Sequence, residues 1–502
     1  MKLARTFCCG ARPHPGPLPR GEGEASAAAR SDVSLRLQGA FPHRSERFTN
    51  LARTKRERAE EGSLLIIVLW IAFGLVALTL YFAHSMSQEL RAADNRVAAL
   101  EANQAIDGAA RYLSNILATV AYPGYMPAPT DFACEAVPVG EATFWLIGRD
   151  TNDWEVDLEQ PFYGLVDEAA KLNLNAPWLT AEMIQYLPGM TPQIAAAIMD
   201  WRDANTSIST DGAEDETYAK LTTSYKTKNA PFESVEELRL VAGMTTEILY
   251  GEDANLNGIL DANENDAEDS APYDNRDGRL DPGLMEYFTV YSYAPTTGTN
   301  LNNPVEVRSM LETYFGQSRA GDMMNQLRST GGTGGQPGGG NTYPYVSSAL
   351  EFYLRGGFTE DEFVQIADYL APTTNILVNV NTASQPVLEC IPGIGVDYAA
   401  QLISFREANP SKLASVAWVA EAIGDDSLAR TAGLYLTTHS YQFTADVAAV
   451  GHHHRGYQRV RFVFDTSEDI PLIIRRQDLT HLGWALGRES RTTLLAAARE
   501  VR

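Results

Sequence analysis

One uncharged, apolar stretch near the start of the chain constrains the fold more than any other feature. Residues 63–83 read SLLIIVLWIAFGLVALTLYFA and contain no Asp, Glu, Lys or Arg. A helix of about 20 apolar residues rises about 30 Å, which matches the hydrocarbon core of a bilayer. Such a helix satisfies its own backbone hydrogen bonds, so lipid can surround it. The sequence therefore predicts a transmembrane helix at this position.

The helical pattern continues beyond the apolar run. Up to about Leu117, apolar residues recur at intervals of three and four, alanine is frequent, and the next proline is Pro123. We therefore expect one helix of more than about 50 residues. Its first half would lie in the membrane, and its amphipathic second half would pack on a folded domain.

The residues ahead of the apolar run predict its orientation and its processing. Arg53, Lys55, Arg56 and Arg58 precede the run, and basic residues hold their end of a span in the cytoplasm. A secretory signal has a shorter apolar region with a small-residue cleavage site after it. Here the small residue, Gly62, comes directly before the run. The bulk of the chain is expected on the far side of the membrane.

This junction resembles the class III leader of type IV pilins and type II secretion pseudopilins. The resemblance implies that a prepilin peptidase cuts after Gly62 and methylates the new N-terminus at Ser63; an uncleaved signal anchor is the alternative. Those families carry a Glu five residues into the mature chain, where this sequence has Ile67. An intramembrane carboxylate is costly unless it is paired. Its absence resembles only the K-type minor pseudopilin of type II secretion, which is proposed to sit at a filament tip.

Charge is distributed unevenly along the chain. Residues 1–62 carry 12 Lys and Arg against 7 Asp and Glu, so the remaining residues carry 28 against 57. An ectodomain this acidic repels phosphate backbones, and we expect no nucleic-acid partner. Residues 1–50 are rich in Pro, Gly and Ala without periodicity, which is typical of an unfolded segment. We expect translation to begin near residue 50, at a codon other than ATG.

An internal duplication occupies the middle of the chain. Each copy has an Asn-x-Asn motif, then Pro-Gly and an apolar residue, then an Ala pair, an Ile, an aromatic residue and an Arg. The first copy contains Asn173, Asn175, Pro188, Gly189, Trp201 and Arg202, and the second contains Asn379, Asn381, Pro392, Gly393, Phe405 and Arg406. Two helix-hairpin-helix-like units explain this pattern, with Pro and Gly in the turns. The turns carry no Lys or Arg, so packing is favoured over DNA-backbone binding.

The most specific chemical motif is an acidic loop, DANLNGILDANE, at residues 253–264. It satisfies the calcium-loop pattern at each fixed position. Its predicted ligands are Asp253, Asn255, Asn257, the carbonyl of Ile259, Asp261 and Glu264. A looser copy with Asn275, Asp277 and Asp281 predicts a second site. The flanks are not clear EF-hand helices, so we expect one or two structural Ca²⁺ ions; a metal-free acidic surface loop is the alternative.

Strand-like segments lie on both sides of this middle region. They are residues 143–148, 154–158 and 163–166 before it and 441–450, 458–465 and 471–476 after it. An alternating run at 286–294 predicts another strand, and residues 305–315 and 360–370 predict helices. Residues 331–340 predict a flexible linker, and residues 488–502 predict a loosely packed tail.

Two groups of side chains leave alternatives open. His452, His453 and His454 are expected to form a turn cluster, because three adjacent His residues on a strand cannot all face one metal ion. Cys134 and Cys390 would lie in an oxidising compartment and could form one disulfide, but their spacing alone does not bring them together.

Together these patterns predict an α+β fold: a pilin-like long N-terminal helix on a small antiparallel sheet, with a large, mostly α-helical insertion. The expected divisions are a leader (1–62), the transmembrane and amphipathic helix (63–120), a first β part (121–170), the insertion (171–438), a second β part (439–485) and a tail (486–502). Within the insertion, the repeats would span 171–250 and 377–430, and the calcium region 252–286.

The order of these motifs resembles the K-type minor pseudopilins of the type II secretion system. The resemblance implies a non-enzymatic, single-pass protein of the inner membrane, with a cytoplasmic N-terminus and a periplasmic C-terminal domain. It also implies a tip complex with the I-type and J-type minor pseudopilins, which initiates or caps the pseudopilus and supports export of folded proteins. A type IV pilus minor pilin is the alternative, and a membrane-anchored DNA-uptake protein is less favoured. The sequence has no GxSxG or HExxH motif that would point to an enzyme.

Overall fold

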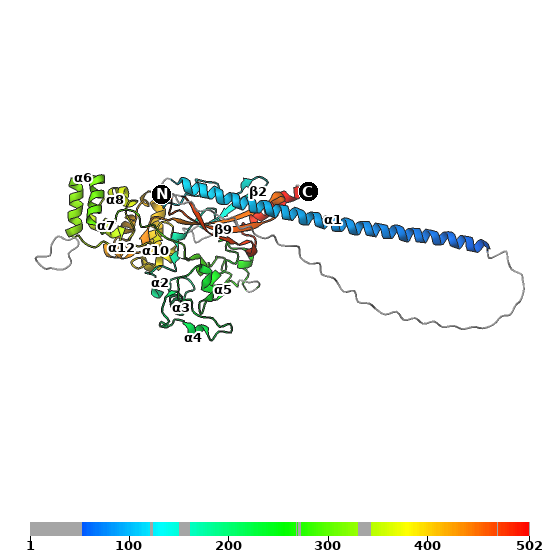
Figure 1. Ribbon diagram of the computed structural model, residues 1–502, viewed down its shortest axis with the longest axis horizontal. Helices are drawn as coiled ribbons and strands as arrows, with labels where there is room; N and C mark the ends of the chain where they lie inside the picture. The colour runs from blue at the N-terminus through cyan, green and yellow to red at the C-terminus, as the bar shows by residue number, and fades with distance from the viewer. Residues whose placement is uncertain are drawn as a thin grey trace, which may run out of the picture. The chain divides into compact units, whose positions relative to one another are not determined.

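The computed structural model describes residues 53–120, 124–149, 161–267, 269, 273–329, 343–468 and 470–500. Contacts divide the chain into two compact units, Met1–Ala83 and His84–Arg502. The described part of the first unit is the start of helix α1 (Arg53–Thr119), drawn in blue in Figure 1. Large apolar side chains from Leu64 to Phe82 are exposed on this helix.

Helix α1 contains 67 residues, as the unbroken helical pattern predicts. Its most apolar window has a mean hydropathy of 2.7, and none of that window is buried within the protein. Among the described residues it is the one helix that is long and apolar enough to cross a membrane. The predicted long N-terminal helix is therefore confirmed.

In the second unit, the later part of α1 packs on an antiparallel sheet (Figure 1). The sheet order is β1-β2-β8-β9-β10, and β3 also pairs with β8. The strands are β1 (Val137–Val139), β2 (Ala142–Ile147), β3 (Val166–Asp167), β8 (Gln442–Val450), β9 (Gln458–Asp465) and β10 (Leu472–Asp478). Strands from before and after the helical region thus share one sheet, with Leu146 opposite Val447.

Small residues on α1 allow the helix to lie close to the sheet. Ala102, Ala105 and Ala109 are fully buried against aromatic side chains that include Phe144 and Phe443. The opposite face of β2 and β8 is covered as well, partly by Ala485 and Leu486. Because both faces are covered, all nine residues of β8 are buried, including the polar Gln442, Thr444 and Asp446.

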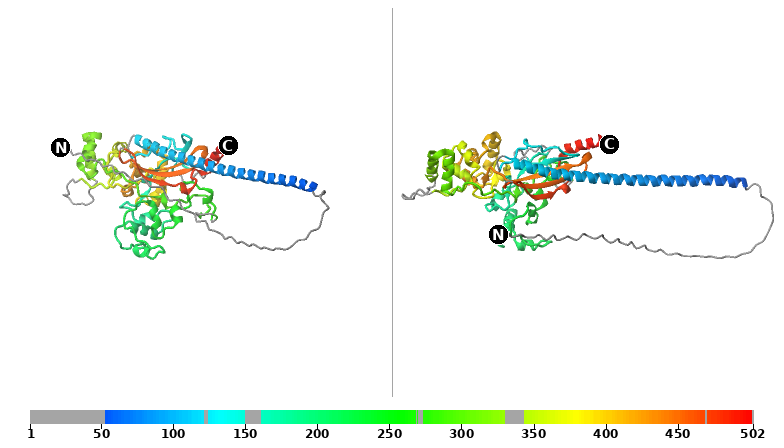
Figure 2. Two further views of the ribbon diagram at one scale, coloured as in Figure 1. Left: turned by 45° about the vertical axis from the view of Figure 1, so that its right-hand side comes forward. Right: turned by 45° about the horizontal axis from the view of Figure 1, so that its top comes forward.

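Between the two halves of the sheet lies a mainly helical region with its own core. Its helices are α2 (Ala181–Ile184), α3 (Pro192–Arg202), α4 (Asp215–Tyr218), α5 (Thr246–Tyr250), α6 (Pro304–Ser329), α7 (Ala349–Gly356), α8 (Glu360–Ala367), α9 (Gln385–Glu389), α10 (Gly395–Ala408), α11 (Trp418–Ile423) and α12 (Asp426–Gly433). Two short pairs of parallel strands also belong to this region. They are β4 (Leu172–Asn173) with β5 (Phe288–Thr289), and β6 (Val378–Asn379) with β7 (Leu436–Thr437). Figure 2 shows this region from two further sides.

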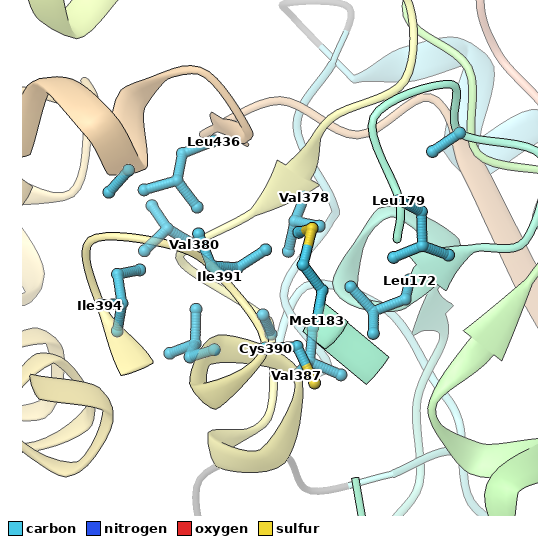
Figure 3. Packing of buried hydrophobic residues seen from close by; sticks show 14 of the residues in the cluster. Leu172, Leu179, Met183, Val378, Val380, Val387, Cys390, Ile391, Ile394 and Leu436 are labelled. Carbon is cyan, nitrogen blue, oxygen red and sulfur yellow. The ribbon is translucent and has the colours of Figure 1, made fainter. Parts of the chain in front are cut away.

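The two sequence repeats share one hydrophobic core. Figure 3 shows Leu172, Leu179 and Met183 of the first copy in the same cluster as Val387 and Ile391 of the second. The repeats therefore pack together as two related halves of a single unit. This placement agrees with a packing role for the duplicated motif.

Each repeat uses its Asn and Arg side chains to fix backbone turns. Asn175 Nδ2 donates to the carbonyl of Phe232 at 2.9 Å, and Asn381 Nδ2 donates to the carbonyl of Leu413 at 2.9 Å. Arg202 donates to carbonyls of the first copy, and Arg406 does the same in the second. The first helix of each copy, α2 or α9, is only about one turn long, and the helix-hairpin-helix description is not confirmed.

The turn glycines explain why the repeats keep Pro-Gly at the same place. Gly189 has φ +71° and Gly393 has φ +91°, a backbone region that favours glycine. At Gly393 an added Cβ would also lie 2.5 Å from the carbonyl oxygen of Leu428. Any other residue at this position would therefore collide with helix α12.

One local expectation is wrong, and the structure adds to others. Of residues 286–294, only Phe288–Thr289 form a strand, because the segment pairs with β4 over just two residues. The expected tail falls largely in helix α13 (Gly487–Glu500); most of its described residues from 488 onward are exposed, and Leu494 packs beside the sheet. Cys134 and Cys390 are free thiols buried in separate cores, so they form no disulfide. Residues 154–158 and 331–340 lie outside the described residues.

Candidate metal centre

Residues 253–264 form a closed loop held by its own acidic side chains. Asp253 is buried, and its two carboxylate oxygens accept hydrogen bonds from the backbone N–H groups of Asn257 at 2.9 Å and Gly258 at 2.8 Å. Gly258 has φ +76°, so the sharp turn uses glycine where the sequence predicts it. The first residue of the loop thereby closes around its middle.

Glu264, the last residue of the loop, binds back to the loop's start and middle. Its Oε1 accepts from the N–H of Ala254 and its Oε2 from the N–H of Asp261, both at 2.9 Å. The side chain is 1% exposed. Both carboxylate oxygens are therefore fixed in position within the loop.

The remaining predicted ligands gather at the same place. Asn255 Nδ2 and Asn257 Nδ2 donate to Asp261 Oδ2 at 2.7 and 3.1 Å. The N–H of Ile259 donates to Asn257 Oδ1 at 2.9 Å. Asn255 Oδ1 is buried without a hydrogen-bond partner among the described residues. The structure thus places Asp261 beside Asn255 and Asn257, while the carboxylates of Asp253 and Glu264 bind backbone N–H groups of the same loop.

Electrostatics of this loop favour a cation. Burial first, and then repulsion from the nearby Asp253 carboxylate, raise the pKa of Glu264 to about 8. Burial also raises the pKa of Asp253, although Arg149 opposes the shift. Two buried carboxylates that repel each other, together with an unpartnered amide oxygen, are a set that a hard divalent cation would satisfy.

The donor set relies on amide oxygens as well as carboxylates. Within the described ranges, no cluster of three or more Asp, Glu, His or Cys side chains forms a metal site by itself. Ca²⁺ accepts amide and backbone carbonyl oxygens together with carboxylates, so Asn255, Asn257 and the Ile259 carbonyl are suitable partners. The residues of the first loop therefore fit Ca²⁺, which stays a prediction.

The second predicted site is more open. Asn275 Nδ2 donates to Asp281 Oδ2 at 3.1 Å, and Asn275 Oδ1 accepts from the N–H of Asp277 at 2.8 Å. All three side chains are exposed. The structure brings Asn275 and Asp281 together, whereas Asp277 Oδ1 accepts from the N–H of Arg279 at 2.8 Å.

Sequence reasoning missed Glu252, which completes the second loop. Its Oε1 accepts from the N–H of Asn275 and its Oε2 from the N–H of Asp281, both at 3.1 Å. Glu264 serves the first loop in the same way, but the position matching Glu264 in the second loop is Leu284. The ligand spacing of the second loop therefore gave no signal for Glu252. The one available signal was that Glu252 is an acidic residue directly before the first loop.

The histidine cluster lies elsewhere, in the turn between β8 and β9. The three residues form a short 3-10 helix, η6 (His452–His454), as the predicted turn requires. His452 Nδ1 lies 2.7 Å from Glu101 Oε2, and its Nε2 lies 2.8 Å from Asp94 Oδ1. Arg455 also binds Asp94. His452 and Arg455 therefore make an ionic contact with α1.

Gly62 and Ser63 lie within α1, directly before the exposed apolar side chains that begin at Leu64. They belong to the first unit of the chain, and the loops belong to the second. Cleavage between Gly62 and Ser63 stays a prediction.

Comparison with known proteins identifies the segment that begins the helical region. Residues 169–250 match the family model described as type II secretion system protein K. Type II secretion system protein K of Pectobacterium carotovorum subsp. carotovorum is 41% identical over 56 residues, which cover 11% of this chain and 17% of the relative. The Klebsiella pneumoniae protein of that name is 46% identical over 52 residues, which cover 10% and 16%. The chain thus spans about a sixth of the length of the curated relatives it matches.

A solved structure was also found. It is the crystal structure of the GspK–GspI–GspJ complex from the enterotoxigenic Escherichia coli type 2 secretion system, of which one chain matches with a TM-score of 0.36 and 12% identity. The match covers 79% of this chain and 98% of that one. Residues 169–250 therefore resemble the domain that the family model of type II secretion system protein K describes.

Proposed function

We propose that this chain is a non-enzymatic minor pseudopilin at the tip of the type II secretion pseudopilus. There it initiates or caps assembly and supports export of folded proteins across the outer membrane. The observation that carries the proposal is Ile67, an exposed apolar residue on α1 of a chain with the protein K domain. Ile67 cannot pair with the N-terminus of a further subunit, whereas a carboxylate at this position could.

We propose that the apolar half of α1 anchors the protein once in the inner membrane. Four basic residues before the span favour a cytoplasmic N-terminus, so the acidic remainder would be periplasmic. Prepilin peptidase would cut between Gly62 and Ser63 and methylate Ser63. Mass spectrometry of the mature protein tests this step, and a chain that keeps residues ahead of Ser63 contradicts it.

Calcium is proposed as a structural ion of the periplasmic part. The first loop would hold it through Asp253, Asn255, Asn257, Asp261 and Glu264, with the carbonyl of Ile259. The second would use Asn275, Asp277, Asp281 and Glu252. When bound, the ion supplies positive charge that neutralises buried carboxylates and favours the folded loop.

The proposed partners are the I-type and J-type minor pseudopilins. Co-expression of the full chain with both proteins, followed by purification in detergent, should recover a complex of the three. Ile67→Glu tests the tip position, with Ile67→Leu as the matched control. If the missing carboxylate restricts the chain to the tip, the Glu variant should appear along the filament shaft and the Leu variant should not. A wild-type chain distributed along the shaft would contradict the proposal.

A further inference from the structure

A buried arginine holds the first loop, residues 253–264, against the sheet. Arg459 of β9 is fully buried and donates to the carbonyl oxygen of Leu256 at 2.6 Å and to that of Asn255. Its guanidinium also binds both carboxylate oxygens of Asp446 on β8, each at 2.8 Å. One side chain therefore joins the loop backbone to two central strands.

A second arginine binds the same loop backbone. Arg149, which follows β2, donates to the carbonyl of Leu256 at 2.9 Å, and its guanidinium lies 3.8 Å from Asp253 Oδ2. It also pairs with Glu286 at 3.2 Å. An added Cβ at Gly258 would lie 3.1 Å from this guanidinium, so the loop and Arg149 are in direct contact.

The loop thus has two faces with different partners. The side chains of Asn255 and Asn257 bind Asp261, where the cation would lie, while the carbonyls of Asn255 and Leu256 accept hydrogen bonds from the arginines. Leu256 has φ +55°, which is uncommon for a residue other than glycine. The arginine contacts offset this strain by binding the carbonyl that the conformation presents.

Cation binding and docking on the sheet therefore favour the same loop conformation. When two interactions stabilise one state of a shared element, each strengthens the other by the same free energy. The loop comes from the helical region, whereas Arg459, Asp446 and Arg149 belong to or follow strands of the sheet. Cation binding would thus be linked to the contact between these two parts of the second unit.

We propose that the first loop links the helical region to the sheet only when a cation is bound, with Arg459 as the positioning residue of the loop. The inference rests on the proposed calcium site. Arg459 does not touch the cation; it holds the carbonyls of Asn255 and Leu256 so that the side chains between Asp253 and Glu264 are already placed for binding. The cation in turn keeps the loop on β8 and β9.

Arg461 provides a matched control. It lies on the same strand as Arg459 and binds the same carboxylate, with Nη2 2.9 Å from Asp446 Oδ2. Among the described residues, its hydrogen bonds go to Asp446 and not to the loop carbonyls that Arg459 binds. Arg459→Met and Arg461→Met therefore both weaken the Asp446 cluster, but only the first removes contacts with the loop.

The test is Ca²⁺ titration of the full-length protein in detergent by isothermal calorimetry. Arg459→Met should weaken the loop's Ca²⁺ affinity by about tenfold or more, as loss of residues that orient metal ligands commonly does. Arg459→Lys should weaken it less, and Arg461→Met should leave it within about twofold of wild type. Equal affinities for the Arg459→Met and Arg461→Met variants would overturn the inference. A wild-type protein that binds no Ca²⁺ would instead overturn the calcium site itself.

Hydrogen exchange tests the reverse coupling without any change at Arg459. Ca²⁺ should slow amide exchange in β8 and β9 of the wild-type protein, and Glu264→Gln should remove this effect. If Ca²⁺ protects residues 253–264 but leaves exchange in both strands unchanged, the ion binds the loop, but the proposed link between Ca²⁺ binding and the sheet is wrong. If the Arg459→Met variant does not fold, this hydrogen-exchange measurement still tests whether Ca²⁺ binding is coupled to β8 and β9.

Discussion

Single residues in the first loop show why an acidic chain would bury charge. Glu264 lies at the end of a loop whose other carboxylates already repel it, and it is nonetheless 1% exposed. A buried charge without a partner costs several kcal/mol, so such an arrangement is retained where a cation can neutralise it. The side chain fixes the loop through two backbone N–H groups and would also present oxygen to the ion.

We expect Glu264→Gln to lower Ca²⁺ affinity at the first loop by at least about tenfold. The amide keeps the size of the side chain but loses its charge and one of two acceptor oxygens. Isothermal calorimetry measures the effect. Glu247→Gln, an exposed change in α5 outside the loop, should bind Ca²⁺ as the wild type does; equal affinities for both variants would contradict the assignment of Glu264.

His452 predicts a pH dependence of stability. Its hydrogen bonds to Asp94, and then to Glu101, raise the pKa of its imidazole, so the folded state favours the charged ring. A raised folded pKa gives stability that is complete below the unfolded pKa and is lost as pH rises through the folded pKa. His452→Gln should therefore lower the unfolding temperature at about pH 6, and the difference from wild type should shrink towards about pH 9. Thermal unfolding across this range measures it, and a difference that stays constant with pH would refute the ionic contact.

At the scale of elements, the β8–β9 turn lies directly on helix α1. An added Cβ at Gly451 would lie 2.1 Å from the carbonyl oxygen of Ala98, and one at Gly456 would lie 2.3 Å from the N of Ala99. The sheet and the helix therefore meet backbone to backbone at this turn. The close approach explains why two glycines bracket the histidines and why His452 reaches carboxylates of α1.

Gly451→Ala should destabilise the protein by about 1–3 kcal/mol, because overpacking at a backbone contact forces the turn away from α1. Denaturant unfolding of the two proteins gives the difference in free energy. Gly321→Ala in α6 is the control: the structure leaves the space around its Cβ open, and alanine favours a helix. If Gly451→Ala proves no more destabilising than the control, the close contact at Ala98 is wrong.

At the scale of the whole molecule, the second unit has separate apolar cores that polar contacts connect. One core lies in the helical region, another between α1 and the sheet, and a smaller one on the far face of the sheet. Arg149 and Arg459 reach from the sheet part to the first loop, so the stability of their contact depends on charge. Calcium would therefore affect the stability of the molecule more than the size of the loop suggests.

Ca²⁺ at about 100 times its dissociation constant should add about 2.7 kcal/mol to the free energy of unfolding. Scanning calorimetry should show a higher unfolding temperature with Ca²⁺ and its loss with a chelator. Mg²⁺ should have a smaller effect, because it requires a tighter octahedral site. Unfolding temperatures that do not respond to Ca²⁺ or chelator would contradict a structural ion.

The sequence by itself determined the features that depend on neighbouring residues. The apolar run and its helical continuation predicted α1, and strand-like residues predicted β9 with its bounds. The ligand spacing of residues 253–264 predicted a Ca²⁺ loop, which stays a prediction. Each of these is a repeat or spacing within a short window, which local backbone geometry converts directly into structure.

Only the tertiary structure decided which distant side chains meet. Arg459 and Leu256 are 203 positions apart, and His452 lies 358 positions from Asp94. Glu252 serves the second loop from outside its motif, and Cys134 and Cys390 lie in different cores. No local spacing encodes such contacts, because they arise when the whole chain buries its apolar faces and its charged groups must find partners among whatever side chains come near.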